Sequence, residues 1–376
     1  MGHSNEDLNA GLDDDFIGVV DQMKGLFSQV ASLFRGRATH TWGVAAKGTA
    51  QIIPSPGFPE SEFLTPGTTY RITMRHSTPG PELDDRTLDG GAASIKFHRD
   101  EADGEGFHDV MMNTGKVLFV ESARAFNTMV QTLPNRSITD PQELRADFVK
   151  RRAKLVTDGI VHDDKLTLGY RTGSFTEFYY HSQVCFEYND RYYLRYRMIP
   201  ADRGPERGLF PASIRSQGRT TDPPWPDDHR AEDHMRRDFQ MRVRRLGVRY
   251  ILQVQLRPID VNDDPWAEKQ ERDRIAQGLE PIALNPTLYW EPRYYPWHDL
   301  ALLSFDDMLA SEEMSDLAFD ANRTDDSIKI PLVTSPRVTA DPRPQADRWS
   351  SFCHSRPLVY YAARQARAAA EKPHAN

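Results

Sequence analysis

Hydrophobic residues recur at three- and four-residue intervals near the start of the chain, the spacing of one face of an α-helix. The stripe comprises Phe16, Val19, Val20, Met23, Phe27, Val30 and Phe34. Asp13, Asp14 and Asp15 stand at its beginning, where carboxylates favour the positive end of the helix dipole, and Gly36 follows the last turn. The pattern predicts a packing helix over residues 14–34.

Between residues 40 and 120 the pattern changes to short β-rich runs separated by clusters of Pro, Gly and Asp. These runs cover residues 39–53, 68–76, 92–98 and 108–122. Further strands are predicted over 248–258 and within 174–200, where Asn189-Asp190 divides two aromatic-rich segments as in a hairpin. Helices are predicted at about 122–131, 141–155, 229–246 and 357–371.

The remaining segments carry little periodicity. Residues 203–228 are rich in Pro, Arg and Asp and are predicted to form a surface excursion, and residues 258–346 are predicted to form long ordered loops around short elements. Because the strands follow one another without regular intervening helices, the sheet should be antiparallel and the class α+β. The many short aromatic strands predict a closed β-barrel of about eight strands with helices packed outside.

Composition narrows the classes of function. The chain has 376 residues, with 47 Lys and Arg against 55 Asp and Glu, and a net charge of −8. This balance argues against a dedicated nucleic-acid binder, which usually carries a basic face. The acidic N-terminus lacks the pattern of a signal peptide, and no apolar run is long enough to cross a bilayer. We therefore expect a cytoplasmic protein with no transmembrane segment, and leave peripheral membrane contact and a homo-oligomer open.

Common catalytic motifs are absent from the sequence. It contains no Walker loop, no GxSxG elbow and no HExxH motif. The two cysteines, Cys185 and Cys353, are far apart in the sequence and form no CxxC or zinc-finger pattern. Neither a disulfide framework nor a thiolate zinc site is therefore expected.

A set of short motifs nevertheless stands in a fixed order along the chain. They are Arg37-Ala38-Thr39-His40, Arg75-His76-Ser77-Thr78, Met112-Asn113-Thr114-Gly115, Phe126, Arg356-Pro357-Leu358-Val359-Tyr360 and Arg367. Each motif alone is unspecific, since an isolated histidine is more often structural than catalytic. Their order and spacing together resemble the haem catalase superfamily, and within it the catalase-related allene oxide synthases and small catalase-like hydroperoxidases.

The resemblance implies a ferric haem b held between the barrel and the C-terminal helix. Tyr360 would be the axial ligand of the iron, and Arg356, four residues earlier, would keep the phenolate in its charged form. Tyr361 is a rival ligand, because the family's Tyr-Pro-Asp continuation is replaced here by Tyr360-Tyr361-Ala362. Cys353 lacks the Gly-rich surroundings of a haem thiolate ligand, which favours a structural role for it.

The family's other cofactor contacts are carried over in the same way. Arg37, Arg75 and Arg367 would bind the haem propionates, because guanidinium groups match carboxylates in bidentate pairs. Phe126 would stack on the porphyrin. Asp89 resembles an aspartate of the family's substrate channel.

On the distal side, the resemblance assigns the proton transfer to His40. A neutral imidazole can take the proton from a peroxide oxygen and return it to the leaving oxygen. Asn113 would position the peroxide without adding charge, and Ser77 would hydrogen-bond His40. We expect His76, Met111 and Met112 to line or adjoin this pocket.

Two departures from true catalases shape the functional hypothesis. The residue before the distal histidine is usually Val in catalases and is Thr39 here, and the chain leaves no room for the C-terminal helical domain of large catalases. We expect an N-terminal arm and helix over 1–36 and a catalase-like haem-binding domain over 37–376. The predicted activity is that of a haem hydroperoxidase or hydroperoxide dehydratase acting on small organic hydroperoxides, above all those of fatty acids. Hydrogen peroxide dismutation and non-catalytic haem binding stay open as alternatives.

Overall fold

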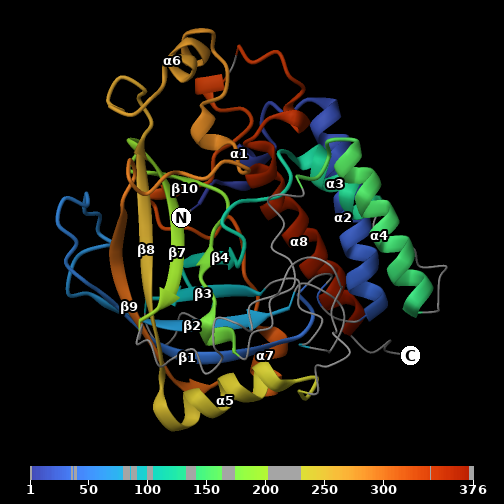
Figure 1. The fold of residues 1–376 in the computed structure, drawn as a ribbon, viewed down its shortest axis with the longest axis vertical. Coiled ribbons are helices and arrows are strands. Elements are labelled where there is room, and N and C mark those ends of the chain that lie inside the picture. The colour runs from blue at the N-terminus through green and yellow to red at the C-terminus, as the bar shows by residue number, and fades with distance from the viewer. Residues whose placement is uncertain are drawn as a thin grey trace.

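The strands form one closed antiparallel barrel (Figure 1). The computed structural model describes residues 2–34, 37, 40–78, 85, 91–99, 105–132, 141–162, 174–201, 230–338 and 340–371. In this part of the chain the strands are β1 (Gly43–Ile52), β2 (Thr69–Ser77), β3 (Ala92–His98), β4 (His108–Asn113), β5 (Tyr180–His181), β6 (Phe186–Tyr188), β7 (Tyr192–Pro200), β8 (Val248–Pro258), β9 (Trp297–Met308) and β10 (Ile328–Lys329). Among these, β1 to β5 and β7 to β9 close into a ring, because β7 pairs with β8. The predicted class, α+β with a closed antiparallel barrel, is confirmed.

The barrel closes through a strand that sequence reasoning missed. Residues 258–346, predicted to be loops around short elements, contain the long strand β9, which pairs with both β1 and β8. The register between β1 and β9 shifts at Gly48, where a Cβ atom would come within 1.9 Å of the Ser304 carbonyl oxygen. Glycine is therefore required at this irregularity, where the two backbones approach closely.

Most other predicted elements are present, with shifted ends. The strand predicted over 248–258 is β8, and the predicted hairpin joins β6 to β7 through Asn189 and Asp190, whose φ angles of 51° and 55° are typical of a type I′ turn. The run predicted over 108–122 ends as a strand at Asn113, and the C-terminal helix begins at Ser351 rather than at 357. The excursion predicted over 203–228 lies outside the described residues.

The helices that the structure describes lie outside the barrel. They are α1 (Asn5–Asn9), α2 (Asp14–Phe34), α3 (Ala123–Thr132), α4 (Pro141–Thr157), α5 (His234–Leu246), α6 (Lys269–Ala276), α7 (Ser311–Asp316) and α8 (Ser351–Glu371), with short 3₁₀ turns at Phe175–Glu177, Ile282–Leu284, Pro336–Val338 and Gln345–Asp347. None of these helices is both long and apolar enough to span a bilayer. On one side of the barrel, α2, α3, α4 and α8 lie together, and α5 covers one end (Figure 1).

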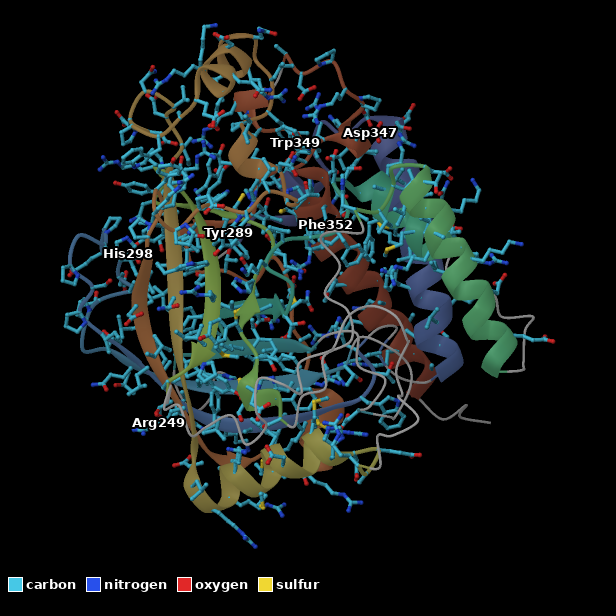
Figure 2. The ribbon with its side chains drawn as sticks, viewed as in Figure 1. Arg249, Tyr289, His298, Asp347, Trp349 and Phe352 are labelled. Carbon is cyan, nitrogen blue, oxygen red and sulfur yellow. The ribbon has the colours of Figure 1, made fainter. Side chains whose placement is uncertain are left out.

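The predicted stripe of α2 packs against α3 and α8. Phe16, Val19, Val20 and Met23 are buried in one cluster with Ala123 of α3 and Val359 of α8. Arg124 of α3 adds an ion pair with Asp347. Asp347 lies just before α8 (Figure 2). The N-terminal helix therefore fixes the position of the C-terminal helix.

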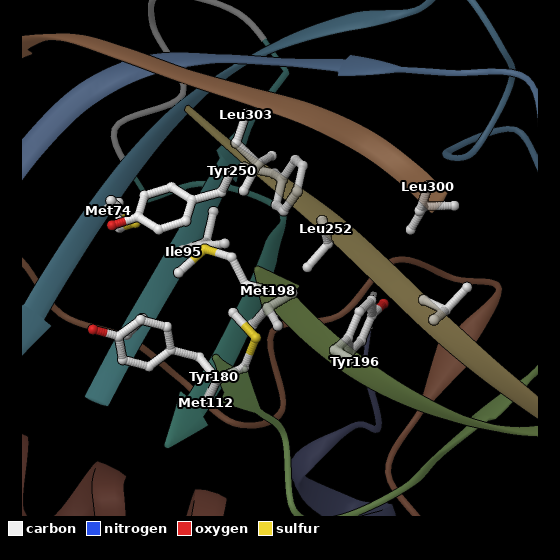
Figure 3. Packing of buried hydrophobic residues seen from close by; sticks show 14 of the residues in the cluster. Met74, Ile95, Met112, Tyr180, Tyr196, Met198, Tyr250, Leu252, Leu300 and Leu303 are labelled. Atoms are coloured by element: carbon white, nitrogen blue, oxygen red, sulfur yellow. The ribbon is translucent and has the colours of Figure 1, made fainter. Parts of the chain in front are cut away.

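The interior of the barrel is filled by large apolar and aromatic side chains (Figure 3). They alternate with outward-facing residues along each strand, as the pleat requires. Two buried histidines are hydrogen-bonded there to tyrosines through Nε2. His76 Nε2 lies 3.0 Å from the Tyr250 hydroxyl, and His108 Nε2 lies 3.2 Å from the Tyr196 hydroxyl.

This alternation corrects one expectation from the sequence. His76 and Met112, expected beside the distal pocket, are buried inside the barrel, where His76 stacks on Phe175 and packs against Phe239 of α5. Their immediate neighbours Arg75, Ser77, Met111 and Asn113 face the opposite way, toward the outside. The physical reason is the two-residue period of a strand, which sends adjacent side chains to opposite faces.

A buried ion pair sits on the outer face, where β3 and β4 pair. Lys96 and Asp109 are directly opposite in the register, and the Lys96 ammonium lies 2.9 Å from one carboxylate oxygen. Both side chains are almost fully buried. Asp109 also accepts hydrogen bonds from Arg323 and from the backbone N–H of Asp320. Burial raises the pKa of the Asp109 carboxyl to about 6, since burial outweighs these cationic partners.

We predict that Lys96→Met strongly destabilises the fold. The substitution would leave the buried Asp109 carboxylate without its main partner, which typically costs about 3–5 kcal/mol. Urea denaturation at pH 7 measures the loss in the free energy of unfolding. Lys24→Met is the matched control, because the Lys24–Asp21 pair is solvent-exposed and should contribute less than about 1 kcal/mol. Equal effects of the two substitutions would contradict the prediction.

Candidate functional site

The candidate site is built on the outer face of strands β1 to β4. Antiparallel pairing places side chains that are opposite in the register on the same face. Two adjacent register rows cross these strands: Gly43, Ser77, Ala92 and Asn113 form one, and Ala45, Arg75, Ser94 and Met111 form the other. We call these eight residues the platform. Five of them are Gly, Ala or Ser, so the side chains of Arg75, Met111 and Asn113 project above their smaller neighbours.

His40 stands at the edge of the platform, just before β1. Its φ of 54° lies in the left-handed region, an uncommon and strained conformation for a residue other than glycine. Its Nδ1 atom lies 3.2 Å from the Ser77 hydroxyl oxygen, and its carbonyl accepts a 2.7 Å hydrogen bond from Arg75. Arg75 therefore holds the strained backbone of His40, and Ser77 holds its imidazole ring.

The surroundings of His40 keep its imidazole neutral. Burial, and then the positive charges of Arg75, Arg356 and Arg37, lower its pKa from 6.5 to about 4. The ring is therefore uncharged at physiological pH. A neutral imidazole can accept a proton from a bound molecule, which a protonated one cannot.

Arg75 is a buried cation that has no carboxylate partner among the residues that the structure describes. Its side chain is 5% exposed, its hydrogen bonds go to the carbonyls of His40 and Thr41, and its buried Nε atom has no partner within the described residues. Burial, with repulsion from Arg37 and Arg367, lowers its pKa well below the usual value. Gly43 makes room for this guanidinium, since a Cβ atom there would lie 2.8 Å from Arg75 Nη2.

Arg37 and Arg367 reach this cluster from other elements. Arg37 donates hydrogen bonds to the carbonyls of Met314 and Leu317, at the end of α7. Arg367 lies on α8 and is half-buried. The structure thus brings together the three arginines that the sequence assigned to one anionic group. A concentration of guanidinium groups of this kind favours an anionic ligand.

Asn113 is oriented by a residue that sequence reasoning missed. Its Nδ2 atom donates a 3.0 Å hydrogen bond to Gln183 Oε1, and Gln183 in turn donates to the Val117 carbonyl. Gln183 has a φ of 61° in the bend between β5 and β6. No sequence signal marks it, because its role depends on a bend whose geometry the local residues do not reveal.

The barrel-facing stripe of α8 carries the candidate iron ligand. Cys353, Arg356, Tyr360, Arg364 and Arg367 follow at intervals of three and four residues, which places them on one side of the helix. Three of them touch the barrel side: Cys353 contacts the Cys185 carbonyl, Arg356 contacts Met111, and Arg364 pairs with Glu105.

Tyr360 and Tyr361 therefore differ in orientation. The Arg356 guanidinium lies 5.8 Å from the centre of the Tyr360 ring. Tyr360 is 38% exposed and lies on the barrel-facing stripe, whereas Tyr361 is 63% exposed and lies one position off it. This arrangement favours Tyr360 over its rival as a ligand in the space between α8 and the platform.

Phe126 lies within the helical layer. Its ring stacks on Phe27 of α2 at 6.3 Å and meets Phe352 of α8 edge-on at 5.1 Å. Stacking on a porphyrin stays a prediction for this residue. Thr39 and Asp89, two further residues singled out from the sequence, lie outside the described residues.

The two cysteines, far apart in sequence, lie near each other in the fold. Cys353 Sγ is 3.9 Å from the Cys185 carbonyl oxygen, and both thiols are free and buried. Burial raises the pKa of both thiols, that of Cys353 to about 12, so they stay protonated and inert. Across the described residues, no group of three His, Cys, Asp or Glu side chains is arranged to hold a metal ion.

Sequence comparison finds relatives of this chain. It is 37% identical over 271 residues to the uncharacterized protein y4iK of Sinorhizobium fredii, covering 70% of this chain and all of that protein. It is 26% identical over 330 residues to a linolenate 9R-lipoxygenase of Nostoc, and 25% identical over 334 residues to the allene oxide synthase-lipoxygenase protein of Plexaura homomalla. These two matches cover 85% and 84% of this chain but only 38% and 28% of the relatives. No protein-family model matches the sequence.

Solved structures with the same fold are catalases. A fungal catalase and catalase A from Saccharomyces cerevisiae each superpose with a TM-score of 0.52 over 89% of this chain, at 16% and 14% identity. The match covers 64% and 66% of those chains. The chain belongs to the catalase superfamily. The allene oxide synthase-lipoxygenase relative is consistent with the resemblance that the sequence motifs indicated.

We predict that this catalase-related protein loses stability on mild acidification. Burial lowers the pKa of five histidines, to about 4 for His40, His108 and His354 and to about 3 for His76 and His181. Below pH 6.5 the unfolded chain binds protons on these rings and the folded chain does not, so acid favours unfolding. Urea denaturation at pH 7 and pH 5.5 should show a loss of about 1 kcal/mol per histidine.

The control for this prediction is His76→Phe, which removes one buried imidazole. Its stability should depend less steeply on pH than that of the wild type, whatever its absolute stability. The raised pKa of Asp109 means that its protonation stabilises the folded state in acid, but this is one group against five histidines. A free energy of unfolding that is constant between pH 7 and pH 5.5 would contradict the prediction.

Proposed function

We propose that this protein is a haem enzyme that processes organic hydroperoxides. The observation that carries the proposal is the unpaired positive charge of Arg75, beside His40 on the platform and with Tyr360 and Arg356 on the facing helix. Among the described residues the buried Arg75 guanidinium has no carboxylate partner, and such a group fits a ligand that carries carboxylates itself. Because most platform residues have small side chains, a planar group could lie over this face of the sheet.

The residues present fit a haem with a phenolate ligand. Arg37, Arg75 and Arg367 would hold the two propionates, and Tyr360 would bind the iron. Arg356 has no carboxylate partner within the described residues, so its charge is available to the phenolate oxygen. Phe126 would pack against the porphyrin. The bound haem would supply the redox chemistry that cleaves the peroxide O–O bond.

The protein's own residues handle the proton of the hydroperoxide. The Ser77 hydroxyl holds His40 at Nδ1, which leaves Nε2 free to take the proton from one peroxide oxygen and return it to the leaving oxygen. One N–H of the Asn113 amide is held by Gln183, and the second can donate to the peroxide. The low pKa of His40 keeps this base in its active form above about pH 4.

The proposed substrate is an organic hydroperoxide, above all one derived from a fatty acid. Two relatives are named as a linolenate 9R-lipoxygenase and an allene oxide synthase-lipoxygenase protein. This chain matches only 38% and 28% of their lengths, and it has the catalase fold. Thr39 precedes His40 where catalases usually have Val, and its hydroxyl can interfere with oxidation of a second hydrogen peroxide. We therefore favour dehydratase or peroxidase chemistry over dismutation.

Hemin titration tests the cofactor and its ligand. We expect the purified protein to bind one hemin with a high-spin ferric spectrum. Tyr360→Phe should remove the phenolate ligand, change that spectrum and weaken binding at least about tenfold, since a direct bond to the iron is lost. Tyr361→Phe is the matched control and should behave as the wild type.

The reverse pattern, with Tyr361→Phe altered and Tyr360→Phe unchanged, would transfer the ligand role to Tyr361. A wild-type protein that does not bind hemin would overturn the proposed cofactor altogether.

A panel of lipid hydroperoxides, hydrogen peroxide and a reducing dye tests the reaction, with products identified by mass spectrometry. We expect rapid consumption of lipid hydroperoxides and weak release of oxygen from hydrogen peroxide. His40→Ala should slow consumption by about 10²–10⁴-fold, the usual contribution of general acid–base catalysis.

Fast oxygen release with no reaction of organic hydroperoxides would make the protein a catalase instead. Hemin binding without consumption of any peroxide would make it a non-catalytic haem protein. Thr39→Val should raise oxygen release, and an unchanged rate would remove the Thr39 hydroxyl from the explanation.

A further inference from the structure

Arg356 is held by an uncharged partner. Its Nη2 atom lies 3.8 Å from the Met111 sulfur, and its guanidinium lies 5.8 Å from the ring centres of both Phe352 and Tyr360. Within the described residues it forms no ion pair. Arg356 is half-buried, and an arginine partly withdrawn from water normally pairs with a carboxylate rather than with two aromatic rings and a thioether.

The pocket beside Arg356 explains why no carboxylate neutralises it. A small cavity there is lined mainly by apolar and sulfur-bearing side chains: Met111, Val184, Cys185, Phe186, Ala321, Ile330 and Cys353. The one acid on its wall is Asp109. That carboxylate already accepts from Lys96, Arg323 and the backbone of Asp320, so it is not available to Arg356.

We propose that Met111 is a positioning residue that holds the Arg356 guanidinium toward Tyr360 without neutralising it. A thioether sulfur is a weak acceptor with no charge, so it can fix the orientation of the cation while leaving its field intact. A carboxylate at the same place would form an ion pair and draw that field away from Tyr360.

The placement of Met111 supports this role. It lies on the platform face of β4, two residues before Asn113, and is half-buried, whereas its neighbour Met112 is 1% exposed inside the barrel. Of these two methionines, Met111 is therefore the one that can reach α8. The adjacent methionine provides a matched control of the same residue type on the same strand.

Nuclear magnetic resonance of the haem-free protein tests the positioning directly. With ¹⁵N-labelled arginine and Arg356→Lys for assignment, rotation of the Arg356 guanidinium is measured in the wild type, Met111→Leu, Met111→Glu and Met112→Leu. We expect rotation several-fold faster in Met111→Leu, slower in Met111→Glu, and unchanged in Met112→Leu. Equal rates in the wild type and Met111→Leu would overturn the proposal.

The consequence for Tyr360 rests on the proposed haem function and is tested separately. In the hemin-loaded proteins, Met111→Glu should lower the reduction potential, because a neutralised guanidinium no longer offsets the negative phenolate. Met111→Leu should lower it by less, and Met112→Leu should leave it at the wild-type value. A potential that responds to Arg356→Lys but to neither Met111 variant would refute the positioning role. Failure of every protein to bind hemin would refute the proposed function alone, and the guanidinium measurement would still decide this inference.

Discussion

The buried guanidinium of Arg75 is the constraint on which the rest of the site depends. Its hydrogen bond to the His40 carbonyl helps to hold that residue in a left-handed conformation, and its charge helps to keep the imidazole neutral. Gly43 is required because a Cβ atom there would come within 2.3 Å of the His76 carbonyl oxygen and 2.8 Å of this guanidinium. The absence of a carboxylate beside Arg75, in the part of the chain that the structure describes, makes the site energetically incomplete without an anion. Favourable packing elsewhere in the protein must therefore offset the free energy that burial of this charge costs.

The barrel separates these two tasks by the alternation of its strands. The inward residues of β2 to β4 are apolar or form closed pairs such as His76 with Tyr250, and they fix the curvature of the sheet. The outward residues of the same strands include Arg75 and the hydrogen-bonding groups of Ser77 and Asn113. Apolar packing and the site residues thus use different faces of one backbone, and the buried Lys96–Asp109 pair adds a stabilising contact on the outer face.

Sequence reasoning found the barrel and the order of the site motifs, because both are carried by local patterns. It missed β9, since the prolines around residues 281–296 obscured the strand that follows. It placed His76 and Met112 beside the site because spacing along the chain does not reveal which face of a strand points inward. Gln183 and the Arg356–Met111 contact depend on segments brought together only by the fold.

Strand β4 connects the two sides of the site covalently. Met111 contacts the helix that carries Tyr360, and Asn113, two residues later, faces the region of His40. A deletion or insertion of one residue within β4 would move both side chains into the barrel and bring inward-facing residues out. The two sides would then be lost together, so this short strand should resist changes in length throughout the evolution of the protein. Divergence in chain length should instead concentrate in the connections between strands.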